Sequence, residues 1–403
     1  MDVHNVFLHG DLTETVYMKQ PAGFVDEEHH DHVWLLQKSL YGLKQTPRAW
    51  FDKFSNFLLE FGFFCSIHDP SLFICAKNGD VIFLLLYVDD MVITGNSSSL
   101  LNSLLEELNK RFRMKDLGQL HYFLGIQAQF HSGGLFLSQQ KYAEDLLIAA
   151  AMSNCSSVAT PLPQQLNKAP HQDRLFENPK YFCSLAGKLQ YLTLTRPDIQ
   201  FSVNYVCQKM HAPIVSDFQH LKRILRYIKG TTTMGISFSN TTNCKMIVFS
   251  DSDYSGCNKT SRSTGGFCTF LGDNIISWSS RKQPTVSKSS TEAEYRAMSE
   301  ATSEITWIVN LLCSLGVPQF ETPELFCDNL SVVYLTANPS FHARIKHFAN
   351  HYHYVREQVA FGNLIVNHIS ADYHIADVFT KSLSQGLFEE LRFKLGVVVC
   401  GGI

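Results

Sequence analysis

The sequence lacks several features that would place it in a broad class at once. No apolar run reaches about 18 residues, the length that a membrane-spanning helix needs, so no transmembrane helix is expected. The first 20 residues contain Asp2, Asp11 and Glu14 but no signal-peptide core, so secretion is not expected. The 11 cysteines include no Cys-x-x-Cys pair, which favours free thiols in a reducing compartment over a zinc ribbon or a disulfide scaffold.

A strong excess of one charge is also missing. The net charge is −3 and only 18% of residues are charged, so any nucleic-acid-binding surface must be local. Hydrophobic residues make up 45% of the chain, which is typical of a globular protein. The length of 403 residues is enough for two or three domains.

The most distinctive stretch is an apolar segment interrupted by two acids. Residues 81–88 are apolar and aromatic, Asp89 and Asp90 follow, and residues 91–94 are apolar again before Gly95. This pattern predicts a strand, an acidic tip and a second strand. Adjacent like charges repel, and a divalent cation such as Mg²⁺ would remove that cost. Taken alone, the segment fits a solvated hairpin tip equally well.

Around this hairpin, helical spacing predicts several helices and a linker. A helix starts near Pro47, and its phenylalanines are expected in the core. Residues 156–180 contain four prolines among polar residues and read as a linker. Further helices are predicted at 97–112, 141–152, 181–210, 216–229 and 291–315.

From Lys245 onward, two predicted strands end in acids. Residues 246–251 end at Asp251 and residues 325–328 end at Asp328. A hairpin across residues 272–274 follows the first of these strands, and a last strand is predicted at 364–369.

Seven motifs in a fixed order resemble one known family. They are residues 1–12 (MDVHNVFLHGDL), 41–50 (YGLKQTPRAW), 87–91 (YVDDM), 250–254 (SDSDY), 289–295 (SSTEAEY), 327–329 (CDN) and 375–381 (IADVFTK). The first three are similar to the reverse transcriptase of Copia-type retrotransposon polyproteins, and the other four to the ribonuclease H that follows it.

The resemblance implies a multidomain α+β and α/β architecture. For residues 1–155 it implies a polymerase palm, which is an antiparallel sheet with helices, and a thumb. It also implies a helical connection in 156–240 and a ribonuclease H-like mixed five-stranded sheet with helices in 241–403.

The resemblance assigns catalytic and metal-binding roles to seven acids. Asp2, Asp89 and Asp90 match the polymerase positions, and Asp251, Glu294, Asp328 and Asp377 match the ribonuclease H positions. Two Mg²⁺ or Mn²⁺ ions per active site are implied. Phe7 matches a ring that excludes a 2′-hydroxyl, and Gly42, Gln45 and Pro47 match the nucleotide-binding pocket.

Two neighbouring acids compete with these assignments. Glu294 shares the apolar helix face with Ala297 and Met298, whereas Glu292 falls beside Arg296 and is expected toward solvent. A buried acid is costly unless it meets a cation, so Glu294 is the preferred metal ligand. Asp251 is preferred over Asp253 mainly because of the resemblance.

Partners and location follow from the same resemblance. It implies an RNA template, a primer, deoxynucleoside triphosphates and an RNA–DNA hybrid as partners, and no membrane. The implied location is the cytoplasm, within a virus-like particle, or the nucleus. In this family an extensive fingers region precedes the first catalytic acid, so a chain starting at Met1 is expected to be a fragment with impaired polymerisation. The alternative is a non-catalytic nucleic-acid-binding remnant.

Two other groups of residues invite a functional interpretation. His347, His351 and His353 have partly helical spacing that suits a zinc site, but a solvated helix face is the commoner explanation. A set of lysines and arginines are candidate phosphate contacts, with ordinary surface charge as the alternative: Lys38, Lys44, Arg48, Lys222, Arg223, Arg226 and Lys229.

Overall fold

The computed structural model describes the chain except residues 4, 167–173, 258, 338–348 and 401–403. It has a mixed α/β architecture with several sheets. The chain divides into two compact units, one of residues 1–120 with 314–316, the other of residues 121–313 with 317–403. In the described part of the chain, no helix combines the length and apolar character needed to cross a membrane.

The first unit is built on a six-stranded sheet. Its order is β4 (Phe64–Cys65), β5 (Leu72–Lys77), β6 (Asp80–Tyr87), β7 (Asp90–Gly95), β1 (Asp2–Val3) and β8 (Met114–Lys115). A separate two-stranded sheet pairs β2 (Tyr17–Lys19) with β3 (Val33–Leu35). The predicted hairpin with an acidic tip is confirmed, because β6 and β7 pair antiparallel across residues 88 and 89.

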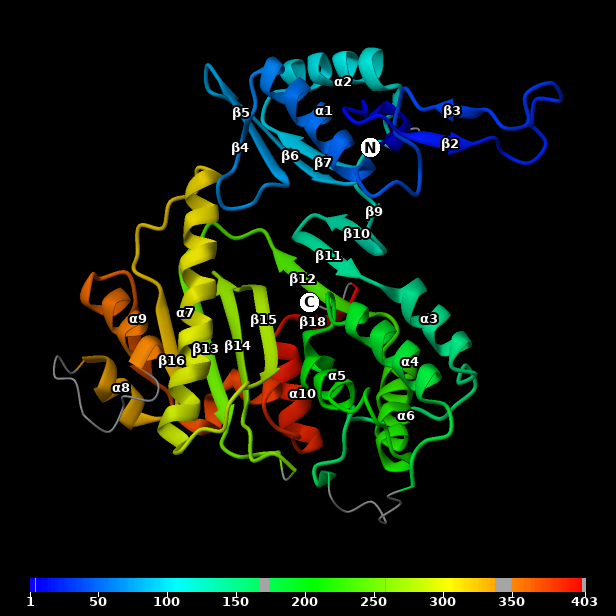
Figure 1. Cartoon of the computed structure of the whole chain (residues 1–403). Helices are drawn as coiled ribbons and strands as arrows, with labels where there is room; N and C mark the ends of the chain where they lie inside the picture. Colours follow the sequence, from blue (N-terminus) through cyan, green and yellow to red (C-terminus); the bar gives the residue numbers. More distant parts are fainter. Residues whose placement is uncertain (4, 167–173, 258, 338–348, 401–403) are drawn as a thin grey trace. The chain divides into compact units, whose positions relative to one another are not determined.

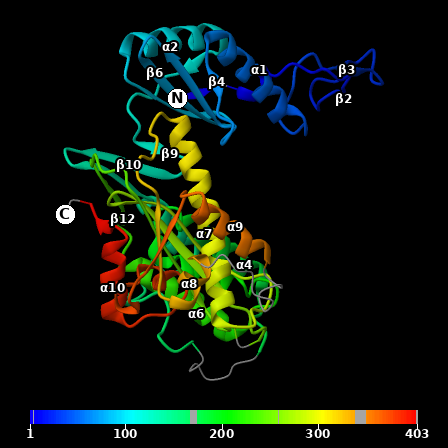
Figure 2. The same cartoon turned by 90° about the vertical axis from the view of Figure 1, so that its left-hand side faces the viewer.

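Helices α1 (Thr46–Phe61) and α2 (Ser98–Phe112) lie on one face of this sheet (Figures 1 and 2). The helix start near Pro47 is confirmed. Phe54 and Phe57 of α1 pack edge-on against Phe112 of α2, and all three are buried. The sequence therefore places this aromatic core correctly, since large rings at helical spacing gain most from burial.

The second unit contains two five-stranded sheets. One has the order β18 (Val397–Val399), β12 (Met234–Ser239), β11 (Gly134–Ser138), β10 (Ile126–His131) and β9 (Tyr122–Phe123). The other has the order β15 (Asn274–Lys282), β14 (Thr264–Leu271), β13 (Met246–Asp253), β16 (Glu324–Cys327) and β17 (Ile365–His368). The second sheet is mixed, because β13, β16 and β17 are parallel whereas β13, β14 and β15 are antiparallel.

Helices cover both faces of the mixed sheet. Helix α7 (Ser290–Ser314) packs on the face of Met246 and Val248, and η6 (Ile375–Phe379) and α5 (Gln200–Cys207) pack on the other. The unit's other helices are α3 (Gln140–Ala149), α4 (Pro179–Leu192), η3 (Pro197–Ile199), α6 (Val215–Lys229), α8 (Leu330–Ala337), α9 (Ala349–Ala360), η5 (Ala371–Tyr373) and α10 (Gln385–Lys394).

Two predictions in the middle of the chain are corrected. The helix expected over 181–210 is divided into α4, η3 and α5, because Pro197 lacks a backbone N–H and clashes with a preceding helical turn. Part of the expected linker is packed instead, since Thr160 and Leu162 are buried. The side chains of α4–α6 share one core with the mixed sheet, and the Trp278 indole donates a hydrogen bond to the Thr193 carbonyl at 3.2 Å. The face of the mixed sheet opposite α7 therefore shares its core with residues before 245, whereas the core beneath α7 is built from residues 246–364.

Candidate functional site

Asp251 and Asp328 are brought together by strand register. Strands β13 and β16 are parallel neighbours in which Phe249 lies opposite Phe326. Asp251 and Asp328 each come two residues later, so both reach the same edge of the sheet. Asp251 is buried at 1% exposure, whereas Asp328 is half-buried just after β16 ends.

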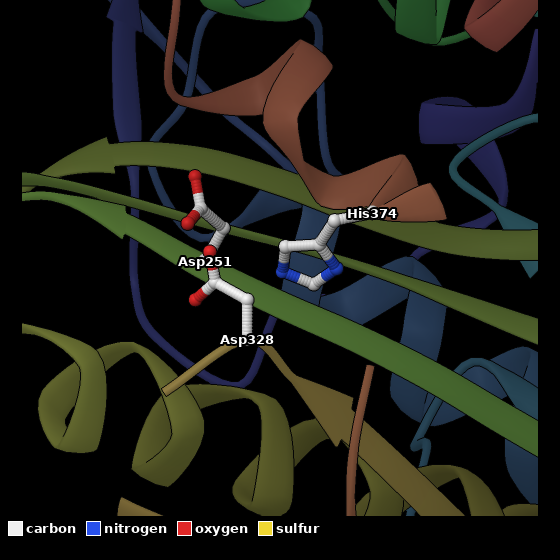
Figure 3. Close-up of side chains that lie close together, drawn as sticks. All are labelled: Asp251, Asp328 and His374. Atoms are coloured by element: carbon white, nitrogen blue, oxygen red, sulfur yellow. The ribbon is translucent and has the colours of Figure 1, made fainter. Parts of the chain in front are cut away.

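His374 completes a cluster that the sequence reasoning missed. One potential ligand atom from each of Asp251, Asp328 and His374 lies within 4.8 Å of the others (Figure 3). The His374 Nε2 is 3.0 Å from the Ser250 carbonyl oxygen, and its Nδ1 is buried without a hydrogen-bond partner in the described part of the chain. The sequence offers no signal for His374 beyond its position three residues before Asp377.

Glu294 reaches the same edge from helix α7. It is 6% exposed, and its Oε1 accepts a hydrogen bond from the Ser252 backbone N–H at 3.1 Å. Its Oε2 is buried and has no hydrogen-bond partner among the residues that the structure describes. Burial and the negative charges of Asp251 and Asp328 raise the pKa of Glu294 well above its ordinary value. The hydrogen bond to Ser252, the residue after Asp251, places Glu294 at the end of strand β13.

The expectation that Glu292 points to solvent is wrong. Glu292 is 1% exposed, its Oε2 accepts from the Lys288 backbone N–H at 2.8 Å, and its Oε1 pairs with Arg296 at 2.8 Å. A carboxylate at the start of a helix is stabilised by free backbone N–H groups and by an arginine one turn later. The Arg296 side chain covers Glu292, so Glu292 and Glu294 are both buried. Of these two, Glu294 has a carboxyl oxygen without a hydrogen-bond partner among the described residues.

Asp377 enters from η6, together with Thr380 and Lys381. The Thr380 hydroxyl donates to Asp251 Oδ2, and Lys381 Nζ lies 2.8 Å from Asp377 Oδ1 and 3.4 Å from Asp251 Oδ2. Burial and the charge of Asp251 raise the pKa of Asp377. Burial alone would lower the pKa of Lys381, but the charges of Asp251 and Asp377 raise it overall, so Lys381 stays an ammonium.

Asp253, the competitor of Asp251, has a different environment. Its carboxylate accepts a hydrogen bond from the Thr264 backbone N–H, and it packs against Gly256, where an added Cβ would clash with it. Burial and the charge of Asp251 raise the pKa of Asp253 to about 7 despite that hydrogen bond. Asp253 therefore closes the 253–264 loop, which leaves Asp251 facing the other acids.

The donor set suits a hard divalent cation. Four carboxyl groups reach this edge from three strands or helices and one loop. Lys381 pairs with those of Asp251 and Asp377, and one buried oxygen of Glu294 has no partner among the described residues. Oxygen donors of this kind are the ligands that Mg²⁺ and Mn²⁺ take in proteins.

We predict opposite effects on stability for the two buried glutamates of α7. Glu294→Gln should raise the free energy of unfolding in chelator by about 1–3 kcal/mol, because a neutral amide is not repelled by the negative charges of Asp251 and Asp328, while weakening Mn²⁺ binding. Glu292→Gln should lower the free energy of unfolding by a similar amount, because the substitution breaks the ion pair with Arg296. Urea unfolding and Mn²⁺ titration measure both effects, and equal losses of stability in the two variants would contradict the prediction.

The three acids predicted for polymerisation lie at the β1–β7 junction of the first unit. Backbone pairing sets Asp2 opposite Asp90, and Met1 and Met91 exchange two backbone hydrogen bonds of 2.9 and 3.2 Å. Asp89 is exposed in the hairpin tip, and the Asp2 side chain lies outside the described residues. Val88 in the same tip has φ 56°, a strained conformation for a β-branched residue, and the Trp50 indole donates to its carbonyl at 2.7 Å.

The predicted nucleotide-binding residues are partly brought together. The Phe7 and Tyr41 rings make an edge contact at 4.8 Å, and the Ser39 hydroxyl donates to the Phe7 carbonyl. Gly42 follows with φ 96°, a conformation that favours glycine, and no atom lies within 4 Å of an added Cβ. Gln45 and Pro47 stand at the start of α1, where Pro47 is exposed.

Two of the predicted phosphate contacts are engaged within the protein. Arg223 donates to the Thr160 hydroxyl at 2.9 Å, and Arg226 donates to the Ser156 carbonyl at 2.8 Å. These arginines attach residues 156–160 to α6.

For the suggested zinc site, His347 lies outside the described residues, and His351 Nδ1 is 3.0 Å from the Ser299 hydroxyl. Among the described residues, the grouping of metal-ligand atoms is that of Asp251, Asp328 and His374.

Known proteins match the chain along its whole length. The family described as reverse transcriptase (RNA-dependent DNA polymerase) matches residues 1–164. The retrovirus-related Pol polyprotein from transposon RE2 of Arabidopsis thaliana is 44% identical over 407 residues, covering 100% of this chain and 28% of that protein. A putative transposon Ty5-1 protein of Saccharomyces cerevisiae is 31% identical over 312 residues, covering 76% of this chain and 100% of that protein. The chain thus spans little more than a quarter of the RE2 polyprotein.

A solved structure also matches part of the chain. The ribonuclease LC11-RNase H1 aligns with 34% of this chain and 93% of its own, at 20% identity and a TM-score of 0.27. That score is too low to establish a common fold.

Proposed function

Because the chain belongs to the reverse transcriptase family of Copia-type retrotransposon Pol polyproteins, we propose that it combines two nucleic-acid activities. The second unit is a ribonuclease H that hydrolyses the RNA strand of an RNA–DNA hybrid. The first unit is the palm of an RNA-directed DNA polymerase. The proposal rests above all on the meeting of Asp251 and Asp328 at one sheet edge, where their ligand atoms lie within 4.8 Å of each other. Glu294 reaches this edge through its hydrogen bond with Ser252, and Asp377 through the Lys381 ammonium that it shares with Asp251.

The ribonuclease site suits divalent-metal hydrolysis. Two Mg²⁺ or Mn²⁺ ions supply Lewis-acid activation of a water and charge neutralisation at the scissile phosphate. Asp251 would be the central ligand, since its carboxyl group lies beside Asp328 and shares Lys381 with Asp377, and Glu294 is bound to the next residue, Ser252. The buried Glu294 keeps one oxygen free to bind an ion, and the Thr380 hydroxyl fixes the orientation of Asp251.

The His374 imidazole has a supporting role beside these acids. Its Nε2–H donates to the Ser250 carbonyl, so the ring holds the backbone immediately before Asp251 in place. A buried histidine of this kind limits movement of strand β13 at the site.

The polymerase assignment uses Asp2, Asp89 and Asp90 as metal ligands. The Asp2–Asp90 pairing brings two of the three residues opposite each other, and Asp89 lies in the hairpin tip directly before Asp90. Phe7 would exclude a ribonucleotide 2′-hydroxyl, with Tyr41 packed against its ring. Gly42, Gln45 and Pro47 form the neighbouring nucleotide-binding segment.

The deciding experiment is cleavage of a labelled RNA–DNA hybrid by the full chain. We expect cleavage of the RNA strand with Mn²⁺ or Mg²⁺, none in chelator, and none of a DNA duplex. Low salt favours the assay, because a chain of net charge −3 has weak long-range attraction for phosphate. Hybrid binding without cleavage would instead support the alternative of a non-catalytic remnant. Primer extension on an RNA template, compared with Asp89→Asn, tests the polymerase half.

A further inference from the structure

Lys381 is an unusual member of the proposed ribonuclease site, because it is a cation placed among metal ligands. Its Nζ contacts carboxylates from two separate elements, Asp377 Oδ1 at 2.8 Å and Asp251 Oδ2 at 3.4 Å. The side chains of Asp251 and Asp377 are 2% and 12% exposed, so water reaches this ion pair mainly from the Lys381 side. The contact is therefore more than an ordinary surface pair between residues four positions apart.

A divalent ion bound to the same two oxygens would meet this ammonium. Mg²⁺ binds carboxylate oxygens at about 2.0–2.1 Å, so an ion on Asp377 Oδ1 would lie within about 5 Å of the observed Nζ position. Two positive charges at that separation repel each other strongly in a partly buried site. Lys381 is itself 39% exposed, so its side chain has a route toward solvent.

The other side of the site has a different charge balance. Among the described residues, no lysine or arginine forms an ion pair with Glu294 or Asp328, and Glu294 Oε2 is buried without a partner. A first divalent ion binding there, between Asp251, Glu294 and Asp328, needs no cation to leave.

We propose that Lys381 is an exchangeable internal cation, which neutralises Asp251 and Asp377 until a second divalent ion displaces its ammonium. This inference rests on the proposed ribonuclease function and adds an order of events to it. One ion binds readily on the Glu294–Asp328 side, and the second binds only as Lys381 withdraws. Lys381 thereby sets the divalent-ion concentration at which the site becomes fully loaded.

The test measures Mn²⁺ binding rather than activity. All proteins are full-length and carry Asp89→Asn and Asp90→Asn, so that the polymerase acids do not contribute. Free Mn²⁺ is followed by electron paramagnetic resonance during titration of this parent, of Lys381→Met and of Lys381→Arg. We expect Lys381→Met to bind its second Mn²⁺ at least about tenfold more tightly than the parent, and Lys381→Arg, which keeps the charge, to behave like the parent.

Thermal unfolding provides a second measurement. Without its cation, Lys381→Met should melt at a lower temperature than the parent in chelator and regain the difference when Mn²⁺ is added. Lys381→Gln, which keeps a hydrogen-bond donor for Asp377 without the charge, should behave in the same way and serves if the methionine variant folds poorly. A melting temperature that Mn²⁺ does not restore would show that the lysine is purely structural and would overturn the proposal.

The outcomes separate this inference from the function on which it rests. Unchanged Mn²⁺ affinity in both uncharged variants, with Asp251→Asn still weakening Mn²⁺ binding, would overturn the role of Lys381 alone. If Asp251→Asn left Mn²⁺ binding of the parent unchanged, the acids would not form a metal site, and the proposed function would fail together with the inference.

Discussion

Replacing Asp251 with asparagine is expected to reduce cleavage of the RNA–DNA hybrid by at least about 10³-fold. Asp251 is the central acid of the site: it lies within 4.8 Å of ligand atoms of Asp328 and His374, and it contacts Thr380 and Lys381. Asparagine keeps the shape but provides a neutral, weaker ligand. The loss should appear mainly in kcat, because hybrid binding depends on phosphate contacts elsewhere.

A matched control is available on the same sheet. Asp273 lies exposed in the turn between β14 and β15, so Asp273→Asn removes the same charge from the same unit away from the acids. We expect it to cleave like the unmodified chain. Equal activity of Asp251→Asn and Asp273→Asn would refute the catalytic assignment, and circular dichroism melting of both variants distinguishes a lost site from a lost fold.

Replacing Arg196 with methionine is expected to lower the free energy of unfolding of the second unit by about 3–5 kcal/mol. The Arg196 guanidinium is 1% exposed and makes two hydrogen bonds of 2.9 and 2.8 Å to the two oxygens of Asp198. It also donates to the Thr231 carbonyl at 2.8 Å. The variant would leave a buried carboxylate with the Tyr227 hydroxyl, at 2.6 Å, as its remaining strong partner.

Two comparisons define the cause of this loss. Lys394→Met breaks an exposed ion pair of 2.7 Å with Glu390 and should cost less than about 1 kcal/mol. The double variant Arg196→Met/Asp198→Leu should recover part of the loss, because it removes the uncompensated charge as well. Urea unfolding of the three variants is the measurement, and a double variant less stable than Arg196→Met would contradict this account.

The pH dependence of the Arg196 effect has a definite sign. Burial alone would raise the pKa of Asp198, but the charge and hydrogen bonds of Arg196 lower it overall in the folded chain. Asp198 therefore contributes stability above the unfolded carboxyl pKa near 4, and this is lost as the pH falls through its lower folded value. In Arg196→Met that contribution is absent, so the difference between the two proteins should shrink in acid.

Local features of the fold follow from the sequence. The hairpin with an acidic tip between β6 and β7, the start of α1 at Thr46 and the long helix α7 agree with the predicted segments. These features depend on residues close in the chain: proline in a first helical turn, glycine at a turn and apolar residues at regular spacing. The same local reasoning failed at Pro197, where one predicted helix was extended across a proline that ends it.

The order of acids was also readable from the sequence, but their environments were not. Strand ends predicted that Asp251 and Asp328 would share a sheet edge, and helical spacing placed Glu294 on the buried face of α7. Whether the sheet brings them within ligand distance depends on the parallel register of β13 and β16, which joins residues 77 positions apart along the chain. The burial of Glu292 depends on Arg296, and an amphipathic pattern records only which residues are apolar.

The sequence by itself determined the family and most of the helices and strands, and it predicted two sets of acids, because these depend on residue identity and on short-range spacing. Only the tertiary structure decided which groups meet at the proposed ribonuclease site. His374, Thr380 and Lys381 join it because η5, η6 and the residues after them fold against the end of β13. Such contacts between distant segments are set by sheet register and core packing, which leave no periodic signal in a single chain.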